Sequence, residues 1–481
     1  MQQVVLAVIF HQGRVVVEQL SEAIQPEFRG VPVVLPGGYV KEGEALKVAI
    51  KRKVVTDIGI TVQVEGLIAT RAHPLFPESS FTYFFCTVIG TATLSNHNRK
   101  KIINAQWVDI NTAATLMLTL HSKVVAFMIR QVYGITLPKG TTLPELAWLA
   151  QDFELFGQKV RAGELVAFPT ETVYGIGANA FDSVAVAKIF KAKNRPADNP
   201  LIVHVPSLEA VEQVAASIDN LSAKLLERLT PGPITVLLPK KDTITDLVTA
   251  GSPFVGVRIP ANLFALEFLA AAKVPIAAPS ANKSGKPSAT HHAHVIEAFG
   301  KEVPNVICAG KTFFGLESTV VLPKNGEQLV ILRQGAITKE NLTLAFPGTE
   351  VIIATINDAT NAPSPGIRQR HYAPTANVTI VPRGTQKSTV ALIKATYRAE
   401  EKNKRAVAIL CSLEMQKKLP GNFTVIPLGS EKEPDTIAKS LYSALLECDS
   451  QGVTKIIIQS FSEAGLGQTL MERIRRISET E

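Results

Sequence analysis

The stretch at residues 168–177 reads FPTETVYGIG and follows a short apolar run that is typical of a buried strand. Pro169 fixes φ, while Gly175 and Gly177 permit backbone conformations that other residues resist. Three hydroxyl groups and one carboxylate fall within the five residues 170–174. A strand end that turns sharply and presents hydroxyl groups suits a polar small molecule. The alternative is a threonine-rich turn between two core strands.

Four further polar clusters follow along the chain, at residues 193–204, 277–290, 315–320 and 332–335. Each comes at the end of an apolar, strand-like run, which is where ligands bind in open α/β sheets. Lys193 and Arg195 stand one residue apart beside a proline. Lysine supplies a point charge and arginine a planar fork, and both suit phosphate. The sequence therefore predicts one cavity for an anionic ligand.

These five motifs, in this order, carry a resemblance to a known family. The region 154–338 resembles the catalytic domain of the threonylcarbamoyl-AMP synthase family. The segment SPGIRQRHYAP at residues 364–374 resembles the interdomain linker of that family's long, two-domain form. The resemblance runs from residue 154 to near the C-terminus.

The resemblance implies a nucleotidyltransferase that makes L-threonylcarbamoyladenylate from L-threonine, bicarbonate and ATP and releases pyrophosphate. This is the first step of threonylcarbamoyladenosine modification of the tRNA adenosine next to the anticodon. Carbamate and mixed anhydride both hydrolyse readily, so the site must exclude water. Negative charge accumulates at the α-phosphate, so cations and backbone N–H groups must face it. No covalent enzyme intermediate is needed.

We assign the motif residues to this reaction in three sets. The catalytic set comprises Lys193, Arg195, Ser280 and Asn282. By resemblance, L-threonine is bound by Thr172, His204, Arg258, Ser318 and Thr319. ATP is assigned to Arg195, Asn199, Ser280, Asn282, Ser288 and Arg333. We expect Mg²⁺ to arrive with ATP, bound by phosphate oxygens and water without a dedicated protein cage.

Two of these residues have ordinary structural alternatives. A lone histidine in an apolar strand such as residues 201–205 is often a satisfied core residue. Arg258 lies inside another apolar strand and needs an anion there, which a structural carboxylate could supply. The motif context favours the ligand-binding role for both.

The linker motif carries a basic, aromatic cluster. Arg370, His371 and Tyr372 follow Arg368 and precede Pro374. The family resemblance implies a lid that folds over the active site. The alternative is an ordinary solvated linker.

The N-terminal segment resembles the Nudix hydrolase fold. Residues 4–10 and 14–19 read as a hairpin, and residues 45–58 as a helix that Gly59 ends. Several Nudix-box residues stand in place: Gly38, Glu44, Arg52, Val54, Gly59 and Ile60. Lys53 and Thr56 replace two of the three box carboxylates, and Asp57 alone keeps the third.

Divalent metal needs several anionic oxygens, so we expect no ordinary Nudix catalysis. The remaining roles for this segment are nucleotide or RNA binding, or a structural one. Glu42, Glu44 and Asp57 are left as a weak candidate metal site.

The expected fold class is α/β and α+β, with several domains. It comprises a Nudix-like α/β/α sandwich, a twisted mixed-sheet α/β synthase domain and a small Rossmann-like parallel α/β domain. Strand–helix alternation after residue 376 predicts the last of these. The expected boundaries are 1–135 for the Nudix-like domain, 136–150 for a linker, 151–345 for the synthase domain, 346–375 for the linker or lid, and 376–481 for the C-terminal domain.

The composition is that of a globular protein, with 46% hydrophobic and 19% charged residues. The net charge of +8 suits ATP or RNA without choosing between them. The four cysteines are widely separated, which argues against structural zinc and favours a reduced, cytoplasmic setting. We expect no signal peptide and no membrane span.

Expected partners are the three small substrates, a downstream tRNA threonylcarbamoyl transferase, and tRNA or double-stranded RNA. One rival interpretation is an RNA-binding module of the same fold without catalysis. Another is a nucleoside-diphosphate hydrolase that works through the Nudix-like domain. Retention of the four catalytic candidates favours the synthase, and Lys53 with Thr56 argues against the hydrolase.

Overall fold

The computed structural model describes residues 2–11, 14–20, 33–72, 79–95, 102–108, 153–354 and 372–478. The chain forms two compact units, one built mainly on residues 1–150 and one mainly on the residues after them. The predicted linker at 136–150 and the lid residues Arg370 and His371 lie outside the described residues. None of the described helices is long and apolar enough to cross a membrane.

The N-terminal unit is built on a mixed sheet. Its described strands are β1 (Gln2–His11), β2 (Arg14–Leu20), β3 (Val33–Val34), β4 (Gly37–Tyr39), β5 (Thr61–Ala72), β6 (Ser79–Ile89) and β7 (Ile102–Val108). The order is β3-β2-β1-β6-β5, while β4 pairs with β1 and β7 with β2. β1 and β6 are parallel, and β1 and β2 form the predicted antiparallel hairpin.

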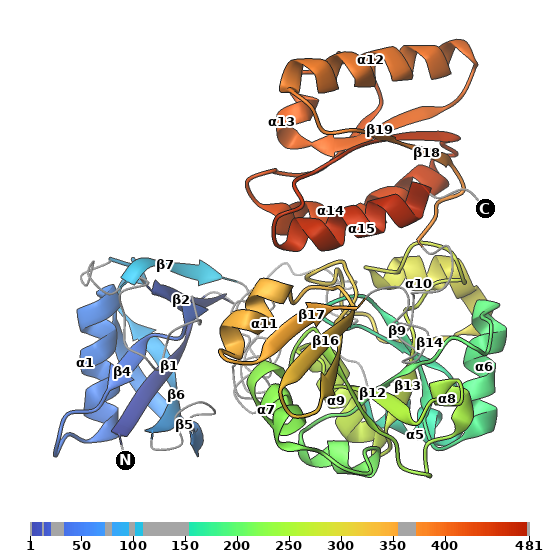
Figure 1. The fold of residues 1–481 in the computed structure, drawn as a ribbon. Coiled ribbons are helices and arrows are strands. Elements are labelled where there is room, and N and C mark those ends of the chain that lie inside the picture. Colours follow the sequence, from blue (N-terminus) through green and yellow to red (C-terminus); the bar gives the residue numbers. More distant parts are fainter. Residues whose placement is uncertain are drawn as a thin grey trace. The chain divides into compact units, whose positions relative to one another are not determined.

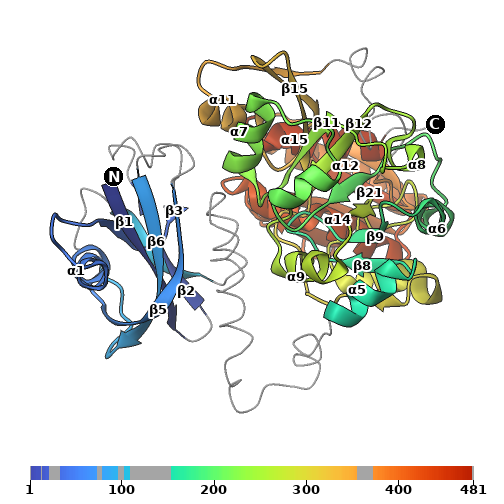
Figure 2. The same ribbon diagram turned by 90° about the horizontal axis from the view of Figure 1, so that it is seen from below.

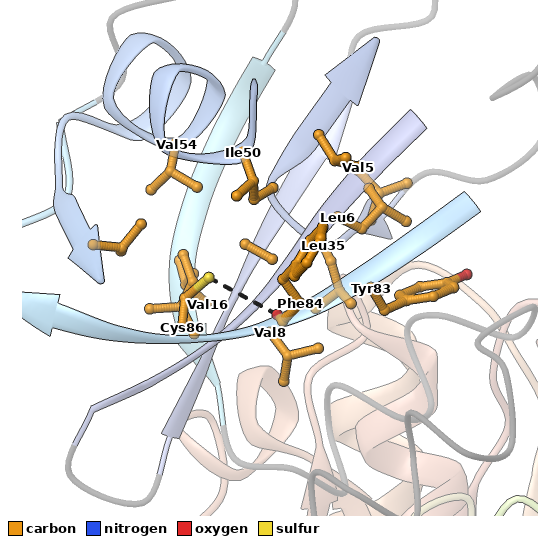
Figure 3. Packing of buried hydrophobic residues seen from close by; sticks show 14 of the residues in the cluster. Val5, Leu6, Val8, Val16, Leu35, Ile50, Val54, Tyr83, Phe84 and Cys86 are labelled. Carbon is orange, nitrogen blue, oxygen red and sulfur yellow. Dashed lines mark hydrogen bonds between the residues drawn. The ribbon is translucent and has the colours of Figure 1, made fainter. Parts of the chain in front are cut away.

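Helix α1 (Leu46–Ile58) packs on one face of this sheet (Figure 2). Ile50, Val54 and Ile58 are four residues apart and are all fully buried. All three belong to the buried hydrophobic cluster that also contains β1 residues such as Val5, and Figure 3 shows Ile50 and Val54 in it. Gly59 ends the helix in the left-handed conformation, with φ of 75°, as the sequence predicts.

The central region is organised around a second mixed sheet in the order β14-β8-β9-β13-β10-β12-β11-β15-β16-β17. Its strands are β8 (Val166–Phe168), β9 (Gly175–Asn179), β10 (Ile202–His204), β11 (Ile234–Pro239), β12 (Phe254–Arg258), β13 (Ile276–Ala278), β14 (Asn305–Val306), β15 (Thr319–Lys324), β16 (Gln328–Arg333) and β17 (Glu350–Ile353). β17 continues this sheet into the segment for which the sequence predicts a linker.

Helices connect most of these strands. They are α5 (Phe153–Arg161), α6 (Ser183–Lys193), α7 (Asn220–Leu229), α8 (Asp246–Thr249), α9 (Leu263–Ala272), α10 (His292–Phe299) and α11 (Lys339–Ala345). The opening motif is the connection between the antiparallel strands β8 and β9. A Cβ at Gly177 would lie 2.6 Å from a methyl carbon of Ile276 on the neighbouring strand, so only glycine fits this close approach.

The C-terminal region is a small parallel α/β domain, as predicted. Its strands β18 (Asn377–Val381), β19 (Val407–Ser412), β20 (Val425–Gly429) and β21 (Lys455–Gln459) lie in the order β18-β21-β19-β20. Helices α12 (Gln386–Lys402) and α13 (Leu413–Gln416) cover one face, and α14 (Pro434–Ser450) and α15 (Leu466–Ser478) cover the other (Figure 1). The multidomain α/β fold class predicted from the sequence is thus confirmed.

Candidate active site

The loop between β8 and β9 is fixed by its own hydroxyl groups. Thr170 Oγ1 lies 2.7 Å from Thr172 Oγ1 and donates to the carbonyl of Val173 at 2.6 Å. It also accepts from the backbone N–H groups of residues 172 and 173, each at 3.2 Å. Thr172 is fully buried in the protein yet lines a cavity. The turn therefore presents a rigid hydroxyl surface.

That cavity gathers residues from every motif singled out in the sequence. Its lining includes ten of the predicted site residues: Thr172, Lys193, Arg195, His204, Arg258, Ser280, Asn282, Ser318, Arg333 and Tyr372. Thr170, Tyr174, Ser284 and Glu317 add further polar groups to the wall. Segments 200 residues apart in sequence thus meet around a single space, because the strand order brings their ends together.

Lys193 ends α6 and ties two motifs together. Its Nζ donates to the carbonyl of Ser280 at 2.6 Å and to the carbonyl of Asn282. Burial lowers the pKa of Lys193 well below its usual value, and the charges of Arg195 and Lys283 lower it further. Among the described residues no carboxylate forms an ion pair with this amine, and an anion bound in the cavity would favour its charged form.

Ser280 and Asn282, whose carbonyls accept from Lys193, are also joined to each other through their side chains. Ser280 Oγ donates to Asn282 Oδ1 at 2.5 Å. The amide nitrogen of Asn282 donates to the carbonyls of Lys283 and Lys286 at 2.8 and 2.7 Å. The side chain of Asn282 thus shapes the loop that follows β13.

Arg195 lies after the helix end at Asn194. Its Nε and Nη2 donate to the carbonyls of Asn199 and Pro200 at 3.3 and 3.0 Å. Burial lowers the pKa of Arg195 to about 10, so the guanidinium stays charged at neutral pH. Asn199 does not line the cavity, and its backbone instead positions Arg195.

His204 and Arg258 end two neighbouring parallel strands and are direct partners in register. Arg258 Nη2 donates to Glu171 Oε1 at 2.7 Å, and both side chains are 4% exposed. Glu171 is therefore the structural carboxylate that the sequence left as the alternative for Arg258, and Arg258 also lines the cavity. Its buried Nε has no hydrogen-bond partner in the described structure.

His204 is an imidazole held in its neutral form. Burial and the charge of Arg258 lower the pKa of His204 to about 3. Its Nδ1 lies 3.2 Å from the carbonyl of Ile202, and its ring packs edge-on to Phe168 with centroids 5.5 Å apart. It can offer one ring nitrogen to a ligand without carrying charge.

Arg333 and Ser318 form a fixed pair on the next strands. Arg333 donates from Nη2 to the carbonyl and the hydroxyl of Ser318 at 2.9 and 3.1 Å. Ser318 Oγ also lies 2.8 Å from Thr235 Oγ1. Thr319, the next residue, turns away from the cavity and bonds to the backbone of Ile337.

Glu317 is a cavity residue to which the sequence analysis assigned no role. Its Oε1 accepts from Ser288 Oγ at 2.8 Å, so Ser288 supports this carboxylate and does not line the cavity itself. Its Oε2 accepts from Tyr442 Oη at 3.1 Å and from Arg473 Nε at 3.2 Å. Burial opposes ionisation, but Arg473 and Arg333 hold the pKa of Glu317 below its usual value.

Tyr372 brings the end of the linker to the cavity. It adopts a positive φ of 70°, and its ring stacks on Tyr442 with centroids 5.1 Å apart. The guanidinium of Arg473 lies 5.2 Å from the centre of the same ring. The next residue, Ala373, donates its N–H to the carbonyl of Gly285 at 2.8 Å. Residues of helices α14 and α15 in the C-terminal domain therefore fix the position of Tyr372 in the cavity wall.

The charged residues of the degenerate Nudix box form ion pairs with one another. Arg52 binds Glu44 through Nε and Nη2 at 2.7 and 2.6 Å, and this contact lowers the pKa of Glu44 to about 2. Lys53 Nζ lies 3.3 Å from the fully buried Asp57. Thr56 Oγ1 donates to the carbonyl of Arg52. Among the described residues no group of three metal-ligating side chains is found.

Family models match three parts of the chain. The model described as "Telomere recombination" matches residues 158–335, and "Threonylcarbamoyl-AMP synthase, C-terminal domain" matches residues 337–478. The model "NUDIX domain" matches residues 1–128.

Curated relatives and solved structures agree with these models. The chain is 40% identical over 325 residues to the threonylcarbamoyl-AMP synthase of Pyrococcus abyssi, which covers 66% of this chain and 92% of that protein. Identity to the Bacillus subtilis threonylcarbamoyl-AMP synthase is 37% over 319 residues, covering 66% and 90%. The crystal structure of P. abyssi Sua5 complexed with L-threonine superposes with a TM-score of 0.62 at 38% identity, covering 68% and 94%.

Proposed function

Because this chain belongs to the threonylcarbamoyl-AMP synthase family, we propose that its central cavity is where L-threonine, bicarbonate and ATP are joined. The product is L-threonylcarbamoyladenylate and the leaving group is pyrophosphate. The observation that carries this proposal is the convergence of Thr172, Lys193, Arg195, Ser280 and Asn282 on one cavity.

The nucleotide lies on the side of Lys193, Arg195, Ser280 and Asn282 in this proposal. Lys193 and Arg195 donate to backbone carbonyls and, in the described ranges, to no carboxylate, so they can neutralise the α-phosphate as charge develops there. Arg333 adds a third cation on the same wall. Preorganised charges of this kind need no rearrangement during the reaction.

L-Threonine lies on the side of Thr172, His204, Arg258 and Ser318 in this proposal. Arg258 has a buried Nε with donor capacity for the substrate carboxylate. Neutral His204 and the hydroxyl of Thr172 suit the substrate hydroxyl or the carbamate oxygens. The related P. abyssi Sua5 crystal structure is a complex with L-threonine, which supports L-threonine as a substrate in this proposal.

Magnesium would accompany ATP and be held by phosphate oxygens. The carboxylates nearest the cavity fit this arrangement, since both oxygens of Glu317 accept hydrogen bonds and Glu171 pairs with Arg258. Such an ion would supply charge neutralisation on the phosphates. We place the reaction in the cytoplasm, in keeping with four free cysteines. A tRNA threonylcarbamoyl transferase would receive the product.

The test is incubation of the full chain with ATP, L-threonine and bicarbonate, followed by pyrophosphate release and mass analysis of the product. Pyrophosphate and the adenylate should form together only when threonine and bicarbonate are both present. Pyrophosphate release that ignores both additions would contradict the proposal. Omission of threonine alone separates synthesis from hydrolysis of ATP.

A further inference from the structure

The two helical layers of the C-terminal domain differ sharply in charge. Residues 382–424, which contain α12 and α13, have three acids and nine cations: Arg383, Lys387, Lys394, Arg398, Lys402, Lys404, Arg405, Lys417 and Lys418. Residues 425–478, which contain α14 and α15, have six cations and seven acids. Positive charge is therefore concentrated on one face of a single sheet, where α12 and α13 lie (Figure 1).

The α14 and α15 layer is already occupied by the synthase region. Tyr442 and Arg473 bind Glu317, and a Cβ at Gly315 would lie 2.7 Å from the backbone of Lys439. The cationic layer on the opposite face of the sheet is thus left to meet a partner.

Four cations of α12 lie along one side of the helix. Lys387, Lys394, Arg398 and Lys402 fall within about 80° of helical rotation, on the side away from the buried Ile393 and Tyr397. We call these four residues the α12 stripe. Three of them are exposed and Lys394 is half-buried. Within the described part of the chain, no carboxylate forms an ion pair with any of them.

Apart from Lys402, which lies in the last turn where the helix dipole favours a cation, this arrangement does not stabilise α12 itself. Lys387 lies in the first turn, where the helix dipole favours an acid, and that turn contains none. Lys394, Arg398 and Lys402 follow at intervals of four residues, so like charges face one another. By contrast, α14 carries Asp435 in its first turn. Helix stability therefore does not account for the first three cations of the stripe, whereas contact with an anionic partner would neutralise all four.

We propose that the α12 stripe binds the phosphate backbone of tRNA. Four-residue steps place Lys394, Arg398 and Lys402 about 6 Å apart along the helix, and Lys387 lies about 10 Å before Lys394. Phosphates follow one another every few ångströms along a strand, so one backbone can meet several of these cations. The full stripe spans about 22 Å. The choice of tRNA among polyanions rests on the proposed function, because that product is consumed in tRNA modification. The contact would hold the labile adenylate close to the RNA that uses it.

The experiment measures binding of labelled tRNA to the full chain by fluorescence anisotropy over a range of salt concentrations. The stripe variant carries Lys387→Gln, Lys394→Gln, Arg398→Gln and Lys402→Gln. If all four bind phosphate, the slope of log affinity against log salt should become shallower by about 3 to 4. Affinity near about 0.1 M salt should fall at least about tenfold.

The matched control removes the same charge elsewhere, through Lys273→Gln, Lys301→Gln, Lys324→Gln and Lys339→Gln, all at exposed lysines. It should keep the tRNA affinity of the unmodified chain. Equal losses in the two variants would overturn the proposal in favour of bulk charge. Absence of tRNA binding by the unmodified chain would also overturn it, as would stripe-dependent capture of phosphatidylserine vesicles without tRNA binding.

Adenylate synthesis by both variants is a separate readout. It should stay unchanged, because none of the eight lysines and arginines lines the cavity. A chain that binds tRNA through the stripe but makes no adenylate would refute the proposed function and leave the RNA contact standing. The opposite result would refute only the RNA contact.

Discussion

The Nudix box and the synthase cavity both place two cations near one helix, yet they treat the charge differently. In the box, Arg52 is matched by Glu44 and Lys53 by Asp57. In the cavity, Lys193 and Arg195 donate to backbone carbonyls, and neither forms an ion pair within the part of the chain that the structure describes. Two ion pairs cancel their own charge, whereas carbonyl oxygens orient a basic side chain without supplying a countercharge.

This difference indicates that the Nudix box retains the fold of its family, whereas the cavity retains the basic groups that a reaction would need. The box keeps its helix, its Gly59 cap and its packing against β1, all of which depend on apolar residues and glycine. Its metal-binding charge is replaced by internal pairing. In the cavity, Lys193 and Arg195 are buried without a carboxylate partner among the described residues, and their charged forms are costly there unless an anionic substrate lies close.

The largest effect should follow removal of a cation from the cavity. Lys193→Met leaves two buried carbonyls without a donor and removes charge near the α-phosphate, so kcat should fall at least about 100-fold. Pyrophosphate release with all substrates present measures it. The control is Lys191→Met, an exposed lysine on the same helix, which should keep its activity. Similar kcat values for the two variants would show that Lys193 does not serve the reaction, and the proposed difference from the Nudix-box cations would then be wrong.

A smaller effect is expected on the threonine side. Arg258→Lys removes the guanidinium fork that binds Glu171, so the KM for L-threonine should rise about 10- to 100-fold. The KM for ATP should change little, and steady-state kinetics with each substrate varied in turn will show it. Equal increases in both KM values would mean that Arg258 acts through folding alone.

His204 should make stability depend on pH. Its pKa is about 3 in the folded chain and 6.5 ordinarily, so below that ordinary value the unfolded chain binds a proton that the folded chain refuses. The free energy of unfolding should therefore fall with falling pH, by about 2 kcal/mol from this group near pH 5. His204→Gln should lose this contribution, as urea titrations at two pH values would reveal. Parallel pH profiles for the two chains would contradict it.

The smallest effect is expected at the Nudix box. Lys53→Met leaves the buried Asp57 without its lysine, which should destabilise α1 by about 1 kcal/mol. Hydrogen exchange of α1 amides measures this, with the exposed Lys51→Met as control. Adenylate synthesis should be unaffected in both. Loss of synthesis in Lys53→Met alone would show that the box contributes to the reaction.

Local patterns predicted much of this molecule. Strands β18 and β21 belong to the small parallel α/β domain that strand–helix alternation after residue 376 predicts. Motif residues at the ends of strands met in one cavity because those strands are neighbours in the mixed sheet, as in the parallel pair β10 and β12. The hydroxyls of Ser288 and Thr319 were harder to orient, since a hydroxyl in a motif bonds equally well to a ligand or to a neighbour.

The local sequence did not predict which residues bind the carboxylate of Glu317. Tyr442 and Arg473 lie 125 and 156 residues further along the chain, on helices whose inward faces look ordinary in sequence. The burial of Arg473 within α15 requires a nearby anion, but that burial is seen only in the structure. Such long-range ion pairs arise from tertiary packing, which no short window of sequence contains.

The contact between Glu317 and Arg473 also has a consequence for unfolding. If either region unfolded alone, the other would keep one buried member of this ion pair without its partner. Partial unfolding of either region is therefore unfavourable. Residues 153–354 and 372–478 should therefore denature in a single calorimetric transition. The domain that carries no reacting atoms would thus set the temperature at which the catalyst fails.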